Sequence, residues 1–299
     1  MTSASGRGRL VALGDSITVG VGDSVGPDAV HGPGWAAHLA TVLGMTEFTN
    51  LATNGARSRD VAVAQLAAAL ALRPRLATVL VGGNDVLRSD FDARLTLMDL
   101  RRSVQELRGA GADVVLVRLP VIGLFELAPR PVRRVMRRRV AAVDAAVDEV
   151  ASASGTDQAP GRVVVVDAAH AIAPAGAKAW HIDRVHPSPA GHRRLALAVA
   201  AALATLDPAY AVVPDGADAA RQVAARLPAA PAPPDLRQRV TWLVRAGLPW
   251  CVRRGRDFLP GLLRAVAHDL RAERALTHGS MVTSLADSGL DPRRRIGRG

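Results

Sequence analysis

The sequence contains very little cysteine, few aromatic residues and no long apolar run, and each scarcity excludes a class of protein. Cys251 is the single cysteine, so neither an intramolecular disulfide nor a cysteine-based metal site can form. Aromatic residues make up 3% of the chain and apolar residues 49%, so the core must be built mainly from valine, leucine and alanine. No run of about 18 apolar residues occurs, and we expect no membrane-spanning helix.

The same scarcities bear on cellular location. A chain with one cysteine fits a reducing compartment. Residues 1–9 are polar and rich in glycine and serine, and the apolar stretch after them is too short for the core of a secretion signal. We therefore expect a cytoplasmic protein.

Acidic residues are outnumbered by basic ones, 27 to 38, which gives a net charge of +11. From Asp215 onward fifteen arginines face eight acidic residues, and a second basic run lies between Arg130 and Arg139. Such an excess favours acidic partners such as lipid headgroups or nucleic acid, whereas solubility is the favoured interpretation of the run between Arg130 and Arg139. The sequence has no zinc finger, basic zipper or aromatic RNA-binding signature, so we expect no nucleic-acid partner.

Short apolar runs alternate with longer helical patterns from residue 10 to residue 206. The runs predict five strands: Leu10–Leu13, Glu47–Asn50, Leu76–Val81, Asp113–Arg118 and Arg162–Asp167. Amphipathic patterns predict helices near Trp35–Leu43, Asp60–Leu72, Phe91–Arg108, Arg133–Ala153 and Pro189–Leu206. Continuous apolar strands are typical of a parallel sheet buried on both faces. The alternation therefore predicts an α/β fold in which helices cover a five-stranded parallel sheet from both sides.

The pattern changes after Leu206, and we divide the chain into three parts. Residues 1–207 form the α/β domain, 208–235 a linker rich in proline and alanine, and 236–299 a basic amphipathic helical extension with a disordered end from Asp291. Two interpretations of the extension stand. Its helices pack on the domain or on each other, which Pro249 and Pro260 favour by interrupting one long helix, or they make peripheral contact with an anionic membrane.

Polar residues follow the predicted strands at the end where ligands gather in such sheets. Gly14-Asp15-Ser16 follows the first strand, residues 50–55 the second and Gly82-Gly83-Asn84-Asp85 the third. Asp183 and His186 lie on a polar loop after the fifth. Serine is a poor nucleophile unless an imidazole takes its proton, and the imidazole works best when a carboxylate fixes its tautomer. The parts of a Ser-His-Asp hydrolase therefore meet at one edge of the sheet.

Four segments, in order, resemble the sequence blocks of the SGNH (GDSL-type) hydrolases, and the similarity covers roughly residues 8–206. The segments are Gly14-Asp15-Ser16-Ile17-Thr18, Asn50-Leu51-Ala52-Thr53-Asn54-Gly55-Ala56, Gly82-Gly83-Asn84-Asp85 and Asp183-Arg184-Val185-His186-Pro187. The resemblance implies a flavodoxin-like three-layer α/β/α sandwich and the hydrolysis of esters or thioesters.

The resemblance also implies a role for each matched residue. Ser16 would be the nucleophile, His186 the general base and Asp183 the group that orients it. The oxyanion hole would consist of the backbone N–H groups of Ser16 and Gly55 and the side-chain amide of Asn84. No metal or organic cofactor is implied, and the expected partner is a small-molecule ester substrate. A neutral imidazole is needed to accept the proton, so activity should fall in acid.

Several of these residues also have an ordinary structural interpretation. Ser16 could be a helix N-cap, a position that serine favours, and Gly55 a turn glycine. His181 is the main competitor of His186 for the base role, whereas His192 is expected to be structural at the start of the last helix. Asp15 is left outside the triad.

Two hypotheses from other classes remain at this stage. The chain could be a non-catalytic binding module of the same fold that attaches to a membrane or partner through its basic tail. A flavodoxin-like sheet could instead bind phosphate or flavin, for which Gly82-Gly83-Asn84 is weak support. The sequence does not predict the acyl chain or the alcohol of the substrate, because the segments 19–34 and 120–131 that would form the pocket walls are variable loops.

Overall fold

The computed structural model describes residues 8–23, 31–120, 122–155, 157–212, 218–242, 244–245, 249, 255–256, 259–268 and 270–271. Its five strands are β1 (Arg9–Gly14), β2 (Glu47–Asn50), β3 (Leu76–Leu80), β4 (Asp113–Arg118) and β5 (Val163–Asp167). They pair in parallel in the order β2-β1-β3-β4-β5. The predicted α/β fold is confirmed, and each strand begins and ends within one residue of its predicted bounds.

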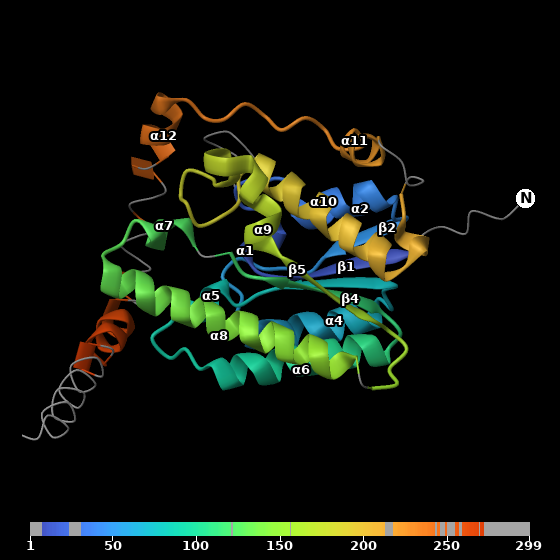
Figure 1. The fold of residues 1–299 in the computed structure, drawn as a ribbon, viewed down its shortest axis with the longest axis horizontal. Coiled ribbons are helices and arrows are strands. Elements are labelled where there is room, and N and C mark those ends of the chain that lie inside the picture. The colour runs from blue at the N-terminus through green and yellow to red at the C-terminus, as the bar shows by residue number, and fades with distance from the viewer. Residues whose placement is uncertain are drawn as a thin grey trace, which may run out of the picture.

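Helices cover both faces of this sheet (Figure 1). The principal ones are α2 (Gly34–Leu43), α4 (Leu66–Ala71), α6 (Ala93–Gly109), α8 (Arg130–Ser154), α9 (Ala168–Ile172) and α10 (Pro189–Leu206). The layer of α2, α9 and α10 lies on one face, and the layer of α4, α6 and α8 lies on the other. The arrangement is the three-layer sandwich expected from the alternation of strands and helices.

The two faces of β1 show how the sequence builds two cores. Leu10 and Ala12 point into the cluster that contains Trp35 of α2, whereas Val11 and Leu13 point into the cluster beneath α4 and α6. All four β1 residues are completely buried. Successive side chains of a strand point to opposite faces, so a strand with a layer of helices on each side must be apolar throughout.

Shorter elements connect these layers or lie after the last strand. They are α1 (Ser16–Val19), α3 (Ser58–Asp60), η1 (Val61–Gln65), α5 (Gly83–Val86), α7 (Gly123–Glu126), η2 (Ala173–Ala179), η3 (Pro208–Tyr210), α11 (Ala219–Ala224) and α12 (Leu236–Trp242). The helix predicted over residues 60–72 is therefore split into α3, the π-helical turn η1 and α4. None of the helices in the described ranges is both long and apolar enough to cross a membrane.

The part of the chain after α10 does not all stand apart from the sandwich. Tyr210 and Leu262 are buried in the core cluster that contains Trp35, and Val212, Val223 and Leu227 pack against this cluster. The division of the chain at residues 207 and 235 stays a prediction. The predicted disordered end from residue 291, like Cys251, lies outside the described residues.

Candidate active site

The carboxyl ends of the strands bring the predicted site residues to one edge of the sheet. Ser16 follows β1, Gly55 follows β2 and Asn84 lies in α5 directly after β3. Asp183 and His186 lie on the loop between η2 and α10. The strand order reverses between β1 and β3, and in open α/β sheets the crevice at such a point is where ligands bind.

The turn after β1 presents Ser16 at the start of α1. Gly14 has φ 148°, and a side chain there would come within 2.2 Å of the Leu80 carbonyl oxygen, so only glycine fits. Asp15 is the N-cap of α1, and its carboxylate accepts a hydrogen bond from the N–H of Ile17 at 3.0 Å. Ser16 is the first residue of the helix, so its hydroxyl is not occupied in capping.

Ser16 and His186, 170 residues apart in sequence, are in direct contact. Ser16 Oγ lies 2.8 Å from His186 Nε2, and His186 Nδ1 lies 2.7 Å from Asp183 Oδ2. An ionised carboxylate can only accept hydrogen bonds, so Nδ1 carries the ring proton and Nε2 presents its lone pair to the serine hydroxyl. The structure therefore brings these three predicted residues together in the order serine, imidazole, carboxylate.

Asp183 also shapes the turn that carries His186. Its other oxygen accepts hydrogen bonds from the backbone N–H groups of Val185 at 2.8 Å and of His186 at 3.0 Å. Burial by itself would raise the pKa of Asp183, but contacts with His181 and His186 outweigh it and hold the pKa well below its usual range. The carboxylate is thus ionised at neutral pH.

His181, the second candidate for the base, faces the carboxylate rather than the serine. Its Nδ1 lies 3.4 Å from Asp183 Oδ2, the oxygen that also bonds His186. Its ring meets the indole of Trp242 in α12 edge-on, with the ring centroids 5.5 Å apart. The C-terminal part of the chain therefore touches the loop that holds Asp183.

Two of the three predicted oxyanion donors are backbone N–H groups, of Ser16 and Gly55. Gly55 has φ 82°, a conformation that favours glycine, and within the described residues neither N–H donates to a protein acceptor. The third predicted donor, Asn84 Nδ2, donates a hydrogen bond to the Ala56 carbonyl at 3.1 Å. This bond fixes the amide of Asn84 beside the loop that carries Gly55.

Two buried carboxylates lie around this edge without joining the triad. Burial raises the pKa of Asp15 to about 6, partly offset by its hydrogen bond to Ile17 and by the charge of His186. Burial also raises the pKa of Asp85, whose oxygens accept from the N–H of Ser58 at 3.0 Å and from its hydroxyl at 2.9 Å. Asp85 thus ties the loop after β2 to the loop after β3.

Gln65, which the sequence analysis did not single out, fixes the backbone just before Ser16. Its side-chain oxygen accepts from the Gly14 N–H at 2.8 Å, and its nitrogen donates to the Gly14 carbonyl at 2.9 Å. Gln65 ends the π-helical turn η1, and π-turns occur frequently at functional sites. No motif marks this residue, because its partner lies 51 positions away.

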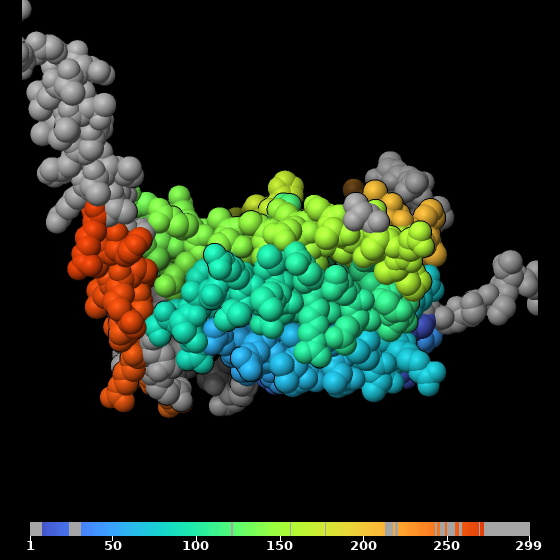
Figure 2. Space-filling view, turned by 90° about the horizontal axis from the view of Figure 1, so that it is seen from below, coloured from blue at the N-terminus to red at the C-terminus, as the bar shows by residue number. Residues whose placement is uncertain are grey.

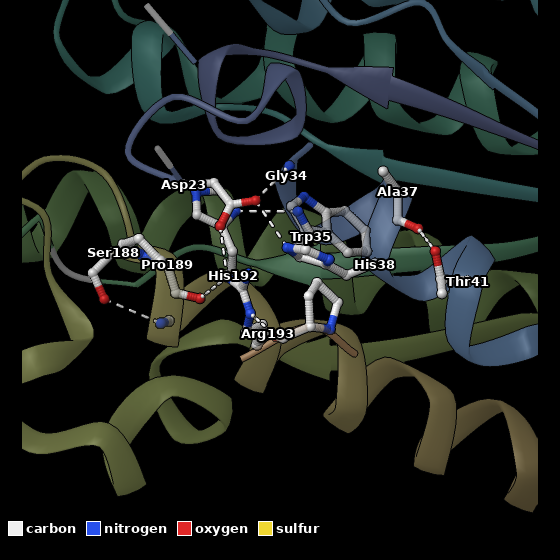
Figure 3. Close-up of polar contacts among 12 residues, drawn as sticks. Asp23, Gly34, Trp35, Ala37, His38, Thr41, Ser188, Pro189, His192 and Arg193 are labelled. Carbon is white, nitrogen blue, oxygen red and sulfur yellow. Dashed lines mark hydrogen bonds and ion pairs between the residues drawn. The ribbon is translucent and has the colours of Figure 1, made fainter. Parts of the chain in front are cut away.

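Figure 3 shows a second buried polar cluster that the sequence analysis also missed, centred on Asp23. The carboxylate of Asp23 accepts from the Gly34 N–H and His38 Nε2, both at 2.8 Å, and from Arg193 Nη1 at 2.9 Å. Burial by itself would raise the pKa of Asp23, but the bond from His38 and the neighbouring groups lower it. The cluster joins the segment after α1 to α2 and α10.

His192 completes this connection as a neutral residue. The Trp35 N–H donates to its Nδ1 at 3.2 Å, so its Nε2 carries the proton and bonds the Val21 carbonyl at 3.0 Å. Complete burial lowers the pKa of His192 to about 4. As expected from the sequence, this histidine serves the structure.

Gly22 lies between Val21, which bonds His192, and Asp23, and it packs directly against His186. It has φ 94°, and a side chain there would lie 2.2 Å from the Pro187 carbonyl oxygen and 3.2 Å from Cβ of both His181 and His186. The segment fixed by Asp23 and His192 is therefore the backing of the loop that carries the imidazole.

A cavity of about 480 Å³ opens beside the loops after β2 and β3. Its lining residues are Arg57, Arg88, Ser89, Asp90, Arg256 and Pro260. Arg57 follows Gly55 by two positions, and Arg256 and Pro260 belong to the C-terminal part of the chain. Three guanidinium groups against one carboxylate make this cavity basic.

In chemical terms, this edge of the sheet offers a serine hydroxyl in contact with an imidazole, and backbone N–H groups beside it. Across the part of the chain that the structure describes, no group of three or more histidine, cysteine, aspartate or glutamate side chains is arranged to hold a metal ion. A hydroxyl, an imidazole and N–H groups in this arrangement are suited to acyl transfer.

Comparison with solved structures supports the fold. The chain resembles Axe2, an acetylxylan esterase from Geobacillus stearothermophilus, with 24% identity and a TM-score of 0.52 over 66% of this chain and 94% of that one. It also resembles LAE5, an α/β hydrolase enzyme from the metagenome of Lake Arreo, Spain, with 23% identity and a TM-score of 0.52 over 68% and 97% of the two chains. Solved forms of Axe2 include catalytic mutants in which a serine, an aspartate or a histidine is replaced by alanine.

Comparison of the sequence itself identifies the family. None of the curated proteins compared with the chain matches it. Residues 12–194, more than half of the chain, match the profile of the GDSL-like lipases and acylhydrolases. The matched range contains all four sequence blocks, and the family assignment makes the chain an ester hydrolase. It belongs to the GDSL-like lipase/acylhydrolase family, as the SGNH-type blocks and the three-layer sandwich both indicate.

Proposed function

We propose that this protein is a serine esterase that hydrolyses carboxylic esters or thioesters through an acyl-enzyme. The single observation that carries the proposal is the contact of Ser16 Oγ with His186 Nε2 at 2.8 Å, continued by the 2.7 Å contact of His186 Nδ1 with Asp183. At these distances a proton passes from the hydroxyl to the ring without any movement of the backbone. The mutated catalytic residue types of Axe2 are the same three.

In the first half of the reaction His186 takes the proton of Ser16, and Ser16 Oγ attacks the carbonyl carbon. The negative charge moves to the carbonyl oxygen, which the N–H groups of Ser16 and Gly55 and the amide of Asn84 stabilise. The tetrahedral intermediate then expels the alcohol or thiol, which receives the proton held by His186. Asp183 keeps the ring oriented and stabilises its transient positive charge.

In the second half water replaces the leaving group. His186 takes a proton from water, the resulting hydroxide attacks the acyl carbonyl, and the same donors hold the second tetrahedral intermediate. Collapse returns the proton to Ser16 and releases the acid. Every step uses groups of the chain itself, so we propose that hydrolysis is metal-independent and expect full activity in the presence of a chelator.

The test combines covalent labelling with kinetics. We expect a fluorophosphonate probe to label the wild-type protein at Ser16, and the Ser16→Ala variant to lose both labelling and hydrolysis of p-nitrophenyl acetate. Ser89→Ala is the matched control, because Ser89 is an exposed serine at the same edge of the sheet. Labelling that persists in Ser16→Ala would show that another residue is the nucleophile. A wild-type protein that neither reacts nor hydrolyses would leave a non-catalytic module of this fold.

A further inference from the structure

The C-terminal part of the chain carries a strip of exposed apolar side chains on two helical segments. In α12 and the turn after it, Leu236, Val240 and Val244 recur every four residues and are each at least 53% exposed. In the helical segment 259–268 and just beyond it, Leu259, Leu263 and Leu270 recur at four and seven residues and are 36–64% exposed. Both spacings place the side chains on one face of a helix.

The same helices are anchored to the body through other faces. Trp242 projects from the side of α12 away from Leu236 and Val240, and its ring contacts His181. In the second segment Leu262 is buried in the core cluster, and Gly261 lies so close to Ser89 that a side chain there would meet it at 2.3 Å. Packing therefore explains one face of each helix and leaves the apolar strip in solvent.

Both anchors lie at the edge of the sheet that carries the candidate active site. In Figure 1, α12 and the segment 259–268 lie on the side of the molecule where α1, α5 and α7 are found. Figure 2 shows the segment 259–268, drawn in red, against one end of the molecule. The contacts of Trp242 with His181 and of Gly261 with Ser89 place the two helices beside the loops after the strands.

The charge of these helices is strongly positive. The stretches 236–245 and 259–271, which carry the strip, contain five arginines and one aspartate. Arg237 and Arg239 stand in α12 beside the apolar strip, and Arg264 and Arg271 accompany the leucines of the second segment. Apolar side chains on one face of a helix flanked by arginine are typical of helices that lie in the surface of an anionic membrane.

We propose that this strip docks the protein on an anionic lipid surface with the active-site edge turned toward the lipid. The strip consists of Leu236, Val240, Val244, Leu259, Leu263 and Leu270. A second copy of the chain would also cover apolar side chains, but facing copies would bring two sets of arginines together. Resting on the proposed esterase function, the docking further assigns the substrate to the class of esters presented at a lipid surface.

Binding is tested with vesicles and does not depend on catalysis. We expect the full chain, and equally Ser16→Ala, to co-sediment with vesicles of equal parts phosphatidylglycerol and phosphatidylcholine but not with pure phosphatidylcholine. High salt should release it, because the electrostatic part of such binding is screened. Vesicle binding by Ser16→Ala separates this proposal from the esterase proposal, since either can fail alone.

Matched double variants locate the surface. Arg237→Gln with Val240→Gln, and Leu263→Gln with Arg264→Gln, each replace one exposed arginine and one exposed apolar residue of the strip. Loss of one arginine should weaken vesicle binding about fivefold, and loss of one apolar side chain at least tenfold. Each pair should therefore weaken vesicle binding roughly 50-fold. The control pair, Arg94→Gln with Met98→Gln, makes the same changes on the exposed face of α6 and should bind as the wild type.

Two results would overturn the proposal. One is vesicle binding that is absent, or that the strip variants and the α6 control change equally. The other is a wild-type dimer in solution, measured by light scattering, that the strip variants convert to monomers, which would make the strip an interface between copies. All substituted side chains are exposed, so thermal unfolding at the wild-type temperature checks that a loss of binding is not a loss of fold.

Discussion

Replacing Asp183 by asparagine separates the two roles of its carboxylate. Asparagine has the same shape, so its side-chain oxygen can still accept from the N–H groups of Val185 and His186, now at 2.8 and 3.0 Å. The amide nitrogen then occupies the place of Oδ2, 2.7 Å from His186 Nδ1. Because that nitrogen only donates, it selects the tautomer in which His186 carries its proton on Nε2, facing Ser16, where it cannot accept another.

The expected loss is large and falls on kcat. Losing a charge-assisted hydrogen bond costs about 1.5–3 kcal/mol. Losing the carboxylate near the imidazolium costs up to about 4 kcal/mol for two charges 4 Å apart at an effective dielectric constant of 20. A combined loss of about 5–6 kcal/mol corresponds to roughly a 10⁴-fold lower kcat, while KM changes little because the substrate pocket is intact.

The assay is steady-state hydrolysis of p-nitrophenyl acetate by Asp183→Asn, His186→Ala and a control. His186→Ala removes the base itself and should cost more, up to about 10⁶-fold. Asp148→Asn removes only a part-exposed surface ion pair with Arg118 and should leave kcat unchanged. An Asp183→Asn enzyme within tenfold of the wild type, or as slow as His186→Ala, would refute the assignment of Asp183 as the orienting group.

The pH dependence of stability gives the same substitution a second readout. The folded-state pKa of Asp183 is depressed, so its carboxylate contributes stability above the unfolded value near 3.8 and loses it as the pH falls below that value. Asp183→Asn should therefore unfold at a lower temperature than the wild type at pH 7, and the difference should shrink in acid.

Three further predictions concern the residues around the triad. Asp23→Asn removes the buried charge that His38 and Arg193 share and turns an amide NH2 toward one of these two donors. It should lower the free energy of unfolding by about 3–5 kcal/mol in urea titrations, and a loss below 1 kcal/mol would mean that the cluster in Figure 3 contributes little. Gly22→Ala forces a side chain against Pro187 and the loop of His186, so kcat should fall at least tenfold with KM nearly unchanged. A variant with the wild-type kcat would contradict the idea that the segment of Gly22 supports this loop. Asp15→Asn removes a carboxylate whose pKa is raised from 3.8 to about 6, so the variant should be more stable than the wild type above pH 6 by up to about 3 kcal/mol and gain nothing at pH 4. Thermal unfolding between pH 4 and pH 7 measures this difference, and an equal gain in stability at both ends would contradict the prediction.

The sheet could be predicted from the sequence because its strands are buried on both faces. Short runs such as Leu76–Leu80 indicate buried strands when glycine, proline or polar residues bound them and helical patterns separate them. The site blocks could be placed for the same reason, since each follows a strand and parallel strands end at one edge. The bounds of β2 and β4 agree with the prediction to the residue.

The supporting residues could not be predicted because their partners are distant in sequence. In the sequence, Gln65 is one polar residue in an amphipathic helical pattern. In the structure it lies in η1, and its amide forms hydrogen bonds with the backbone of Gly14. Asp23 lies in a segment that the sequence presents as a variable loop, and His38 lies on an otherwise apolar helix face. Asp85, whose place after a glycine turn suggests a local cap, instead binds Ser58 at the start of α3. Local pattern carries no information on contacts of this kind.

The position of the imidazole depends on two separate supports, and their chemistry explains why both are charged. Asp183 holds the ring from within its own turn, whereas Asp23 holds, through Gly22, the segment on which that turn rests. A neutral amide could make the same number of hydrogen bonds, but it would not fix the direction of each, because one of its two ends must donate. A buried carboxylate accepts at both oxygens, so every group facing it must be a donor, and the tautomers of His38 and His186 follow from that requirement. A buried carboxylate that lacks its donors is strongly destabilising. Arrangements of the site that leave Asp23 or Asp183 without these donors are therefore disfavoured, and one arrangement is preferred.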